Sequence, residues 1–384
     1  MFSVGLFLKN HKFESLDGLR GLLALSIAAY HFKVLWHGFD TSLLNASYLA
    51  VDFFFVLSGF VITHASSCKL DTAKDGLVFA IRRLGRIWPL HVLVIIGLFC
   101  NEIFKMLVMM GTGIIPNEPP FGGQNTLATL PYNLLLLHGV GVMDDLTWNG
   151  PSWSIGSEFY TYLLFAVAFI WGKRAFAAIA ATFVAVCVTL IALWAPTMDT
   201  SFDYGFLRCV AGFFTGYFVY RLWLVSPGKL PYANGVEAAS VLFVIVFTML
   251  YHDTKLSILA PFVMAIPVWV LAHQQGWISN WLKLGWMQKL GLWSYGIYMV
   301  HTLVLVGVSQ ALTVIEKITD IAFKSQVTLA NGEQKEIINI FSPWLNDMLM
   351  LVYLAAVVAT AALAYRFVEN PARNYFNGLA RKLT

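Results

Sequence analysis

The sequence carries little charge for its length. Only 12% of its 384 residues are Asp, Glu, Lys or Arg, whereas about 25% is usual in a soluble domain, and 58% are hydrophobic. The formal net charge of +4 is too small and too scattered to indicate a nucleic-acid-binding surface. This composition leaves no room for a large soluble domain and predicts that most of the chain lies in a bilayer.

Metal-like cysteine spacing and internal repeats are also missing. The four cysteines, Cys68, Cys100, Cys187 and Cys209, lie in or beside apolar runs, so we interpret them as small core residues and expect no metal. Many secondary transporters show an inverted repeat, which this sequence lacks. The first apolar run has no clear small-residue cleavage site, which predicts a retained helix rather than a secretory signal.

What the sequence does contain is a series of apolar runs near the length of about 20 residues that a spanning helix needs. We predict an all-α, polytopic membrane bundle of about ten transmembrane helices, formed by residues 1–384 as a single domain. The predicted spans are about 16–37, 48–68, 87–109, 151–171, 175–195, 203–222, 235–252, 257–273, 290–312 and 346–368. The segment 130–142 is apolar for only about 13 residues, which favours an interfacial or re-entrant piece.

The distribution of Lys and Arg predicts how the bundle is oriented. With both termini cytoplasmic, eighteen of the 25 Lys and Arg residues fall on the inner side, as the positive-inside rule requires. Two longer connections, about 110–150 and about 313–345, then lie outside and could cap an acceptor site. We therefore predict a multi-pass protein of the cell inner (plasma) membrane, surrounded by membrane lipids.

The first span carries an arginine and a histidine eleven residues apart. At about 100° per residue, Arg20 and His31 share one helix face about 16 Å apart. This spacing suits a long ligand with a charged head and a reactive tail, such as acyl-CoA, with His31 as general base on an acceptor hydroxyl. The alternative is that Arg20 extends to the interface and His31 is an ordinary core histidine.

Two carboxylates fall inside predicted spans, where they are costly and indicate function. We predict that Asp52 pairs with His31 and orients its imidazole, the alternative being a structural ion pair or a helix cap. Glu158 is predicted to act at the site, with Trp153 stacking on an acceptor sugar. Pairing of Glu158 within the bundle is the alternative.

Further polar side chains flank the third span and line the ninth. Arg83 and Arg86 are three residues apart, and with Arg20 they could converge on one polyphosphate, although flanking charge or anionic-lipid contact would also explain them. In the ninth span Ser294, Tyr298 and His301 follow an i, i+4, i+7 pattern, which predicts a polar stripe on an apolar helix.

Together these strings resemble the acyltransferase-3 family of integral-membrane O-acyltransferases, in its stand-alone membrane type. The resemblance rests on motifs that occur in order along nearly the whole chain: Leu16–Gly21 with His31, Val51–Phe60, Arg83 with Arg86, Trp153–Glu158 and Ser294–His301. It implies acyl-CoA-dependent O-acylation, usually acetylation of sugars in lipopolysaccharide, capsule, exopolysaccharide or lipid-linked glycans. It also implies that His31 is the catalytic residue and that Arg20, Arg83 and Arg86 bind the donor.

We therefore predict a transferase that moves an acyl group, in the first instance acetyl from acetyl-CoA, to a hydroxyl of a cell-envelope polysaccharide or lipid-linked sugar. The predicted roles are catalysis for His31, Asp52 and Glu158, donor binding for Arg20, Arg83, Arg86, Ser294 and Tyr298, and acceptor binding for Trp153 and His301. No metal and no nucleic acid is expected to take part. The alternatives are a proton-coupled transporter of a sugar or acyl compound, which would also use ionisable groups in the membrane, and a purely structural role.

Overall fold

The computed structural model is built almost entirely of helices, and it describes residues 11–66, 70–112, 118–226, 228–329 and 334–383. Cys68 lies outside the described residues. The longer helices are α2 (Glu14–His31), α4 (Ala50–Ser66), α5 (Ala73–Thr112), α7 (Trp153–Gly172), α8 (Phe176–Trp194), α9 (Gly205–Val225), α10 (Ala233–Tyr251), α11 (Ala260–Leu271), α13 (Gly285–Thr319), α14 (Pro343–Ala364) and α15 (Asn370–Leu383). Short elements between them are α3 (Ser42–Asn45), α6 (Leu130–Leu134), α12 (Trp277–Leu282), several 3₁₀ turns, a π-helical turn (Tyr365–Glu369) and the antiparallel strands β1 (Lys324–Thr328) and β2 (Gln334–Ile338).

Every predicted span coincides in large part with one of these helices. Among the described residues, six segments are long and apolar enough to cross a membrane: Ser42–Ser66, Ala73–Thr112, Gly150–Trp194, Ala233–Tyr251, Gly285–Thr319 and Pro343–Leu383. The fold is therefore that of a multi-pass membrane protein made of helices. The number of ten crossings and the cytoplasmic position of both termini stay predictions.

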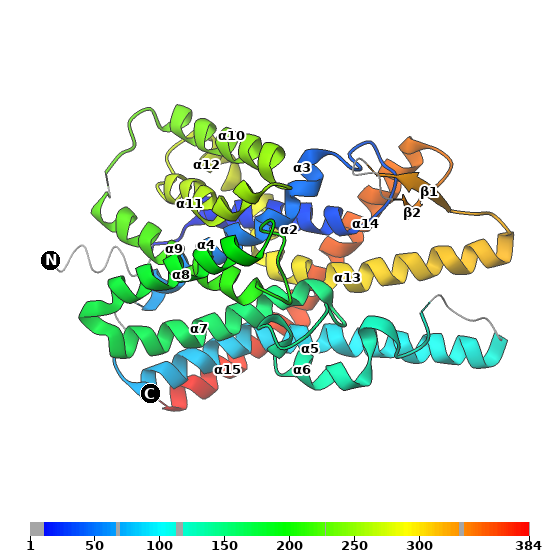
Figure 1. Cartoon of the computed structure of the whole chain (residues 1–384), viewed down its shortest axis with the longest axis horizontal. Coiled ribbons are helices and arrows are strands. Elements are labelled where there is room, and N and C mark those ends of the chain that lie inside the picture. The colour runs from blue at the N-terminus through cyan, green and yellow to red at the C-terminus, as the bar shows by residue number, and fades with distance from the viewer. Residues whose placement is uncertain (1–10, 67–69, 113–117, 227, 330–333, 384) are drawn as a thin grey trace.

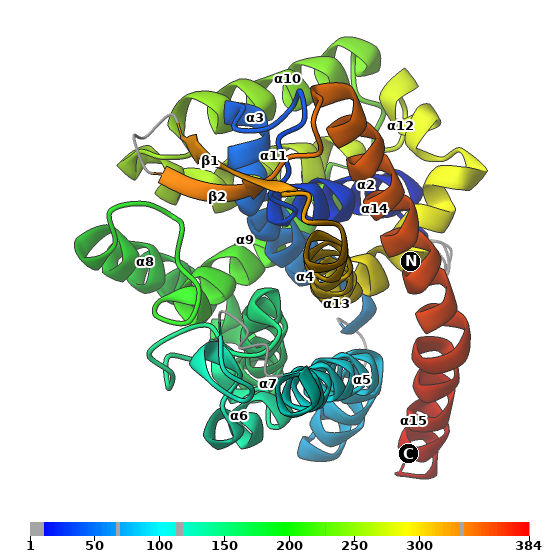
Figure 2. The same cartoon turned by 90° about the vertical axis from the view of Figure 1, so that its right-hand side faces the viewer.

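The long helices run side by side in one bundle. In Figure 1 the β1–β2 hairpin and the far ends of α5 and α13 lie at the right, which we call the hairpin end, while α15 ends at the left. Figure 2 shows α4 and α13 near the middle, between a layer with α10 and α12 and a layer with α5, α6 and α7. The helices that meet in the middle of the bundle are the ones that carry the predicted site residues.

Glycines allow two of the central helix pairs to approach closely. A Cβ atom on Gly59 of α4 would lie 1.8 Å from the carbonyl oxygen of Phe213, and one on Gly216 of α9 would lie 2.0 Å from that of Val56. On the other pair, a Cβ on Gly291 of α13 would lie 2.2 Å from the Asp17 carbonyl oxygen of α2. Small residues permit such backbone contact between membrane helices.

Three local features differ from the sequence prediction or refine it. Helix α5 begins at Ala73 rather than near 87, so Arg83 and Arg86 lie on the helix and Pro89 lies inside it instead of in its first turn. The segment 130–142 forms only the five-residue α6 and a 3₁₀ turn, which confirms that it does not span. The β hairpin was not predicted, and it is anchored beside the end of α2, where the Leu35 amide donates to the Ile338 carbonyl at 2.9 Å.

Candidate functional site

A cavity of about 110 Å³ lies among the central helices. Its lining residues come from α2, α4, α5, α7 and α13, with Val51, Phe54 and Ile155 among the apolar ones. Its polar lining consists of Arg20, Ser58, Arg83, Arg86, Ser154, Glu158, Tyr162, Ser294, Tyr295 and Tyr298. The three predicted donor-binding arginines therefore converge on one space, together with Glu158, Ser294 and Tyr298.

Contacts to α13 hold Arg20 in place. Its Nε donates to Ser294 Oγ at 2.7 Å, and its Nη2 donates to the Gly291 carbonyl oxygen at 2.9 Å. Asp17, one turn earlier on α2, lies 3.5 Å from the guanidinium group. The close approach of α2 to Gly291 makes these bonds possible. Ser294, which was predicted to contact the donor, thus holds the arginine.

Arg83 faces the cavity with part of its hydrogen-bonding capacity unused. Its guanidinium group lies over the rings of Phe79 and Tyr162, at 5.3 and 5.9 Å from their centroids. Its buried Nε finds no hydrogen-bond partner in the described part of the chain. A buried cationic donor without a partner is costly, so this position favours an anionic ligand in the cavity.

Glu158 is bound within the helix bundle as well as lining the cavity. Tyr162, one turn later on α7, donates its hydroxyl hydrogen to Glu158 Oε1 at 2.5 Å, and Ser58 Oγ lies 2.9 Å from the same hydroxyl. These bonds tie α7 to α4 at the cavity wall. The bond to Tyr162 therefore agrees with the alternative prediction that Glu158 pairs within the bundle.

The polar stripe on α13 leads from the cavity to the histidines. Tyr298 donates to the Pro151 carbonyl oxygen at 2.7 Å and lies 2.8 Å from Ser154 Oγ. Its ring centroid is 5.9 Å from that of His301, which in turn is 4.9 Å from that of His31. His31 and His301 do not line the cavity themselves but lie beyond its Tyr298 side.

The hydrogen bonding of His31 determines which of its nitrogens can act as a base. Nδ1 lies 2.8 Å from the carbonyl oxygen of Ile27, which can only accept, so Nδ1 carries the hydrogen and a neutral ring has its lone pair on Nε2. His301 is completely buried, and neither of its ring nitrogens has a hydrogen-bond partner among the described residues. The two imidazoles therefore form a pair with unused hydrogen-bonding capacity.

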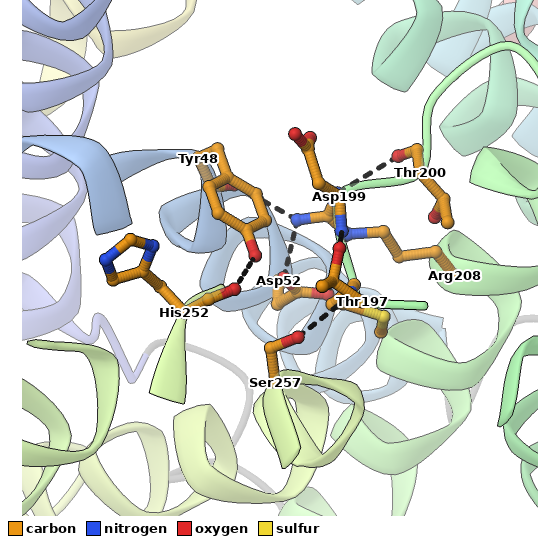
Figure 3. Close-up of polar contacts among 9 residues, drawn as sticks. Tyr48, Asp52, Thr197, Asp199, Thr200, Arg208, His252 and Ser257 are labelled. Atoms are coloured by element: carbon orange, nitrogen blue, oxygen red, sulfur yellow. Dashed lines mark hydrogen bonds and ion pairs between the residues drawn. The ribbon is translucent and has the colours of Figure 1, made fainter. Parts of the chain in front are cut away.

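Asp52 does not pair with His31, and that prediction was wrong. Its carboxylate binds Arg208 of α9, with Nε to Oδ1 at 3.1 Å and Nη2 to Oδ2 at 2.7 Å. Figure 3 shows that Arg208 also donates to the carbonyl oxygens of Tyr48 and Thr200, both at 3.0 Å. A guanidinium fork satisfies both carboxylate oxygens at once, which a neutral imidazole cannot do.

Arg208 was missed by the sequence analysis, although a signal was available. It falls inside the predicted span 203–222, where an unpaired arginine is as costly as an unpaired aspartate. Trp153 belongs to the same region, because Arg208 lies 5.6 Å from its ring centroid and only 7% of Trp153 is exposed. Trp153 does not line the cavity, so its position does not support stacking on a sugar.

The described residues contain no group of three or more His, Cys, Asp or Glu side chains arranged to hold a metal ion. The residues suited to bind an anionic co-substrate are instead Arg20, Arg83 and Arg86, which line the cavity. Together, the apolar helices and this cavity define a multi-pass membrane protein with a cationic internal site.

Comparison with known proteins identifies the family. A model described as an acyltransferase domain matches residues 13–368, so the chain belongs to the acyltransferase-3 family. It is 34% identical over 174 residues to "Protein 2 in picA locus" of Rhizobium radiobacter, a match that covers 43% of this chain and 84% of that protein. No solved structure matches the chain significantly.

Other relatives have names that state an activity. The chain is 23% identical over 405 residues to the peptidoglycan O-acetyltransferase OatA of Listeria monocytogenes, covering 96% of this chain. It spans only 58% of that relative's length. It is also 25% identical over 334 residues to the acyltransferase MdmB of Streptomyces mycarofaciens, covering 77% of this chain and 79% of the relative.

Proposed function

We propose that this protein transfers an acetyl group from acetyl-CoA to a hydroxyl of a cell-envelope polysaccharide or lipid-linked sugar, in the inner membrane. Membership of the acyltransferase-3 family and similarity to a peptidoglycan O-acetyltransferase support acyl transfer to an envelope polymer. The identity of the donor, the identity of the acceptor and the location in the inner membrane belong to the proposal.

The observation that carries the proposal is the arrangement of α2. Arg20 lies on this helix and lines the cavity together with Arg83 and Arg86. His31 ends the same helix, and its Nε2 has a lone pair that can act as a base. The arginines are suited to bind the phosphates of a CoA donor. Three turns of α2 separate Arg20 from His31 by about 16 Å, a length that the extended pantetheine arm has to bridge.

The chemistry then follows from the unused lone pair of His31. Nε2 takes the proton of the acceptor hydroxyl while the hydroxyl oxygen attacks the thioester carbonyl carbon. The new C–O bond forms, the C–S bond breaks, and the CoA thiolate leaves and takes up the proton from His31. His301 is placed to hydrogen-bond a reacting group beside His31, and Tyr298 lines the route to it. Asp52 acts at a distance from this chemistry, by holding Arg208.

The experiment that tests the proposal is mass spectrometry of envelope glycans from a deletion strain complemented with wild type, His31→Ala or the control His252→Ala, at matched membrane levels. We expect an acetyl ester to return with wild type and with the control, and to be absent with His31→Ala. Full esterification with His31→Ala would rule out the assigned base. No ester with any of the three would refute glycan acetylation.

The transport alternative receives no support from the named relatives, which are acyltransferases. It would require sugar or acyl-compound movement across vesicle membranes without CoA. Covalent transfer of labelled acetyl from acetyl-CoA by the purified protein would exclude transport as the explanation of the ester.

A further inference from the structure

Glu158 is an anion in a cavity whose other charged side chains are arginines. It lines the same space as Arg20, Arg83 and Arg86. Opposite charges inside a protein attract one another strongly, because little water screens them. Nevertheless, in the described part of the chain Glu158 forms no ion pair with any of the three arginines, and its carboxylate accepts from the Tyr162 hydroxyl instead. The cavity thus keeps apart an anion and cations that would neutralise one another.

The Tyr162 hydroxyl is held in one direction by two hydrogen bonds. A phenol has a single hydrogen, and Tyr162 gives it to Glu158 Oε1 at 2.5 Å. Ser58 Oγ lies 2.9 Å from the phenol oxygen, so it is Ser58 that donates its hydrogen to that oxygen. One bond comes from α4 and the other lies within α7. Together they fix the position of the carboxylate at the cavity wall.

The ring of Tyr162 is fixed as well. It is buried and packs edge-on against Phe79 and Phe213, with ring centroids 6.1 and 5.8 Å away. The guanidinium group of Arg83 lies over the same ring, 5.9 Å from its centroid, where a cation is attracted to the face of an aromatic ring. One side chain therefore contacts both charges, the cation through its ring and the anion through its hydroxyl.

The arginines would bind a carboxylate that was free to move. The Nε of Arg83 has no partner, and Arg86 forms no hydrogen bond or ion pair with another described residue. A guanidinium group binds a carboxylate through two parallel hydrogen bonds, the same mode in which it binds a phosphate. If Glu158 lost its bond to Tyr162, it would compete for the donors that the proposed function assigns to the donor phosphates.

We propose that Tyr162 is a positioning residue that keeps Glu158 away from the arginines and so leaves Arg83 and Arg86 free to bind the phosphates of the acyl donor. The inference rests on the proposed function, which it deepens by naming the residue that stops the protein's own carboxylate from occupying the donor site. Ser58 supports the arrangement through its bond to the phenol oxygen.

The test measures equilibrium binding of acetyl-CoA, without acceptor, to the purified full chain in lipid nanodiscs. Tyr162→Phe keeps the ring and removes the hydroxyl, and we expect it to bind about tenfold more weakly, the effect of one hydrogen bond to a charged group. Tyr162→Phe combined with Glu158→Gln should bind about as tightly as wild type, because the glutamine carries no charge to pair with the arginines. Glu158→Gln alone should bind at least as tightly as wild type.

Two controls separate this effect from damage to the fold. Tyr160→Phe removes a hydroxyl of the same helix that donates to the Leu135 carbonyl oxygen at 3.0 Å, and Tyr160 does not line the cavity, so this variant should bind like wild type. The combined variant is the second control. A fold damaged by loss of the Tyr162 hydroxyl would stay damaged after Glu158→Gln, so recovery identifies the charge of Glu158 as the cause.

The outcomes decide between this inference and the proposed function. Weaker binding by Tyr162→Phe that Glu158→Gln restores supports the positioning role. Unchanged binding by Tyr162→Phe, or a loss that persists in the combined variant, overturns it and leaves the proposed donor intact. If wild type binds inorganic pyrophosphate but not acetyl-CoA, and the variants keep the same order of affinity, the donor is wrong and the inference stands. A wild type that binds neither probe overturns both.

Discussion

At the scale of single residues, the charged side chains of the site differ in the groups that they bind. Asp52 accepts from Arg208 with both carboxylate oxygens inside the bundle, and Arg208 gives its remaining hydrogen bonds to two backbone carbonyl oxygens. Arg20 is held by neutral oxygens of α13, and the Nε of Arg83 has no partner among the described residues. An arginine of the cavity whose donor has no partner has binding energy left for a ligand.

This difference predicts the effect of Arg83→Ala. Loss of a charge-assisted contact to a donor phosphate costs about 1.5–3 kcal/mol, which corresponds to a KM for acetyl-CoA about ten to a hundred times higher. The KM for the acceptor should change little, because the acceptor hydroxyl is assigned to His31, which lies outside the cavity that Arg83 lines. Steady-state kinetics with both substrates varied measures the two values.

Arg82→Ala is the matched control for this prediction, because Arg82 precedes Arg83 on α5 and does not line the cavity. It should leave both KM values near those of wild type. An Arg83→Ala protein with a normal donor KM would show that the cavity does not hold the phosphates.

At the scale of elements, glycine contacts determine how closely the helices can lie. Helix α9 packs on α4 through Gly216 and Gly59, and it carries Arg208 in its first turn, so the α4–α9 crossing positions both members of the buried ion pair. The same principle places Arg20 against α13 through Gly291. Backbone atoms cannot move aside as side chains do, which makes these positions sensitive to a single methyl group.

We expect Gly216→Ala to destabilise the protein by about 1–3 kcal/mol, because the new Cβ would overlap the carbonyl oxygen of Val56. Thermal unfolding of the purified protein in detergent measures the effect. Gly235→Ala is the control, since Gly235 lies in α10 with no atom near its Cβ position, and alanine there favours the helix. Equal stability of both variants would contradict the tight α4–α9 contact.

At the scale of the whole molecule, the protein is a bundle whose long helices extend beyond a bilayer. Helix α5 has 40 residues, or about 60 Å at 1.5 Å per residue, against about 30 Å for the hydrocarbon core. Its far end and that of α13 lie at the hairpin end (Figure 1), and β2 of the hairpin pairs with the connection that follows His31. His31 ends α2 next to the hairpin, whereas the arginines line the cavity among the central helices.

The predicted orientation places the hairpin end outside and the end of α15 inside. In a background without cysteine, Lys335→Cys in β2 should react with a membrane-impermeant maleimide in intact spheroplasts, and Arg381→Cys in α15 should react only after lysis. Both side chains need to react in lysed membranes, which controls for access. The reverse pattern would place the hairpin end on the cytoplasmic face. It would contradict the prediction that the arginines face the cytoplasm.

The sequence did not predict α15, but by itself it determined the helical membrane class and the approximate place of the other long helices. It could do so because apolar length and helical spacing are local properties. Only the tertiary structure decided that Arg20, Arg83 and Arg86 line one cavity, that Asp52 binds Arg208 and that Trp153 is buried beneath Arg208. Asp52 and Arg208 are separated by 156 positions in the sequence. Helix spacing states which face of a helix a side chain occupies but not which other helix packs against that face.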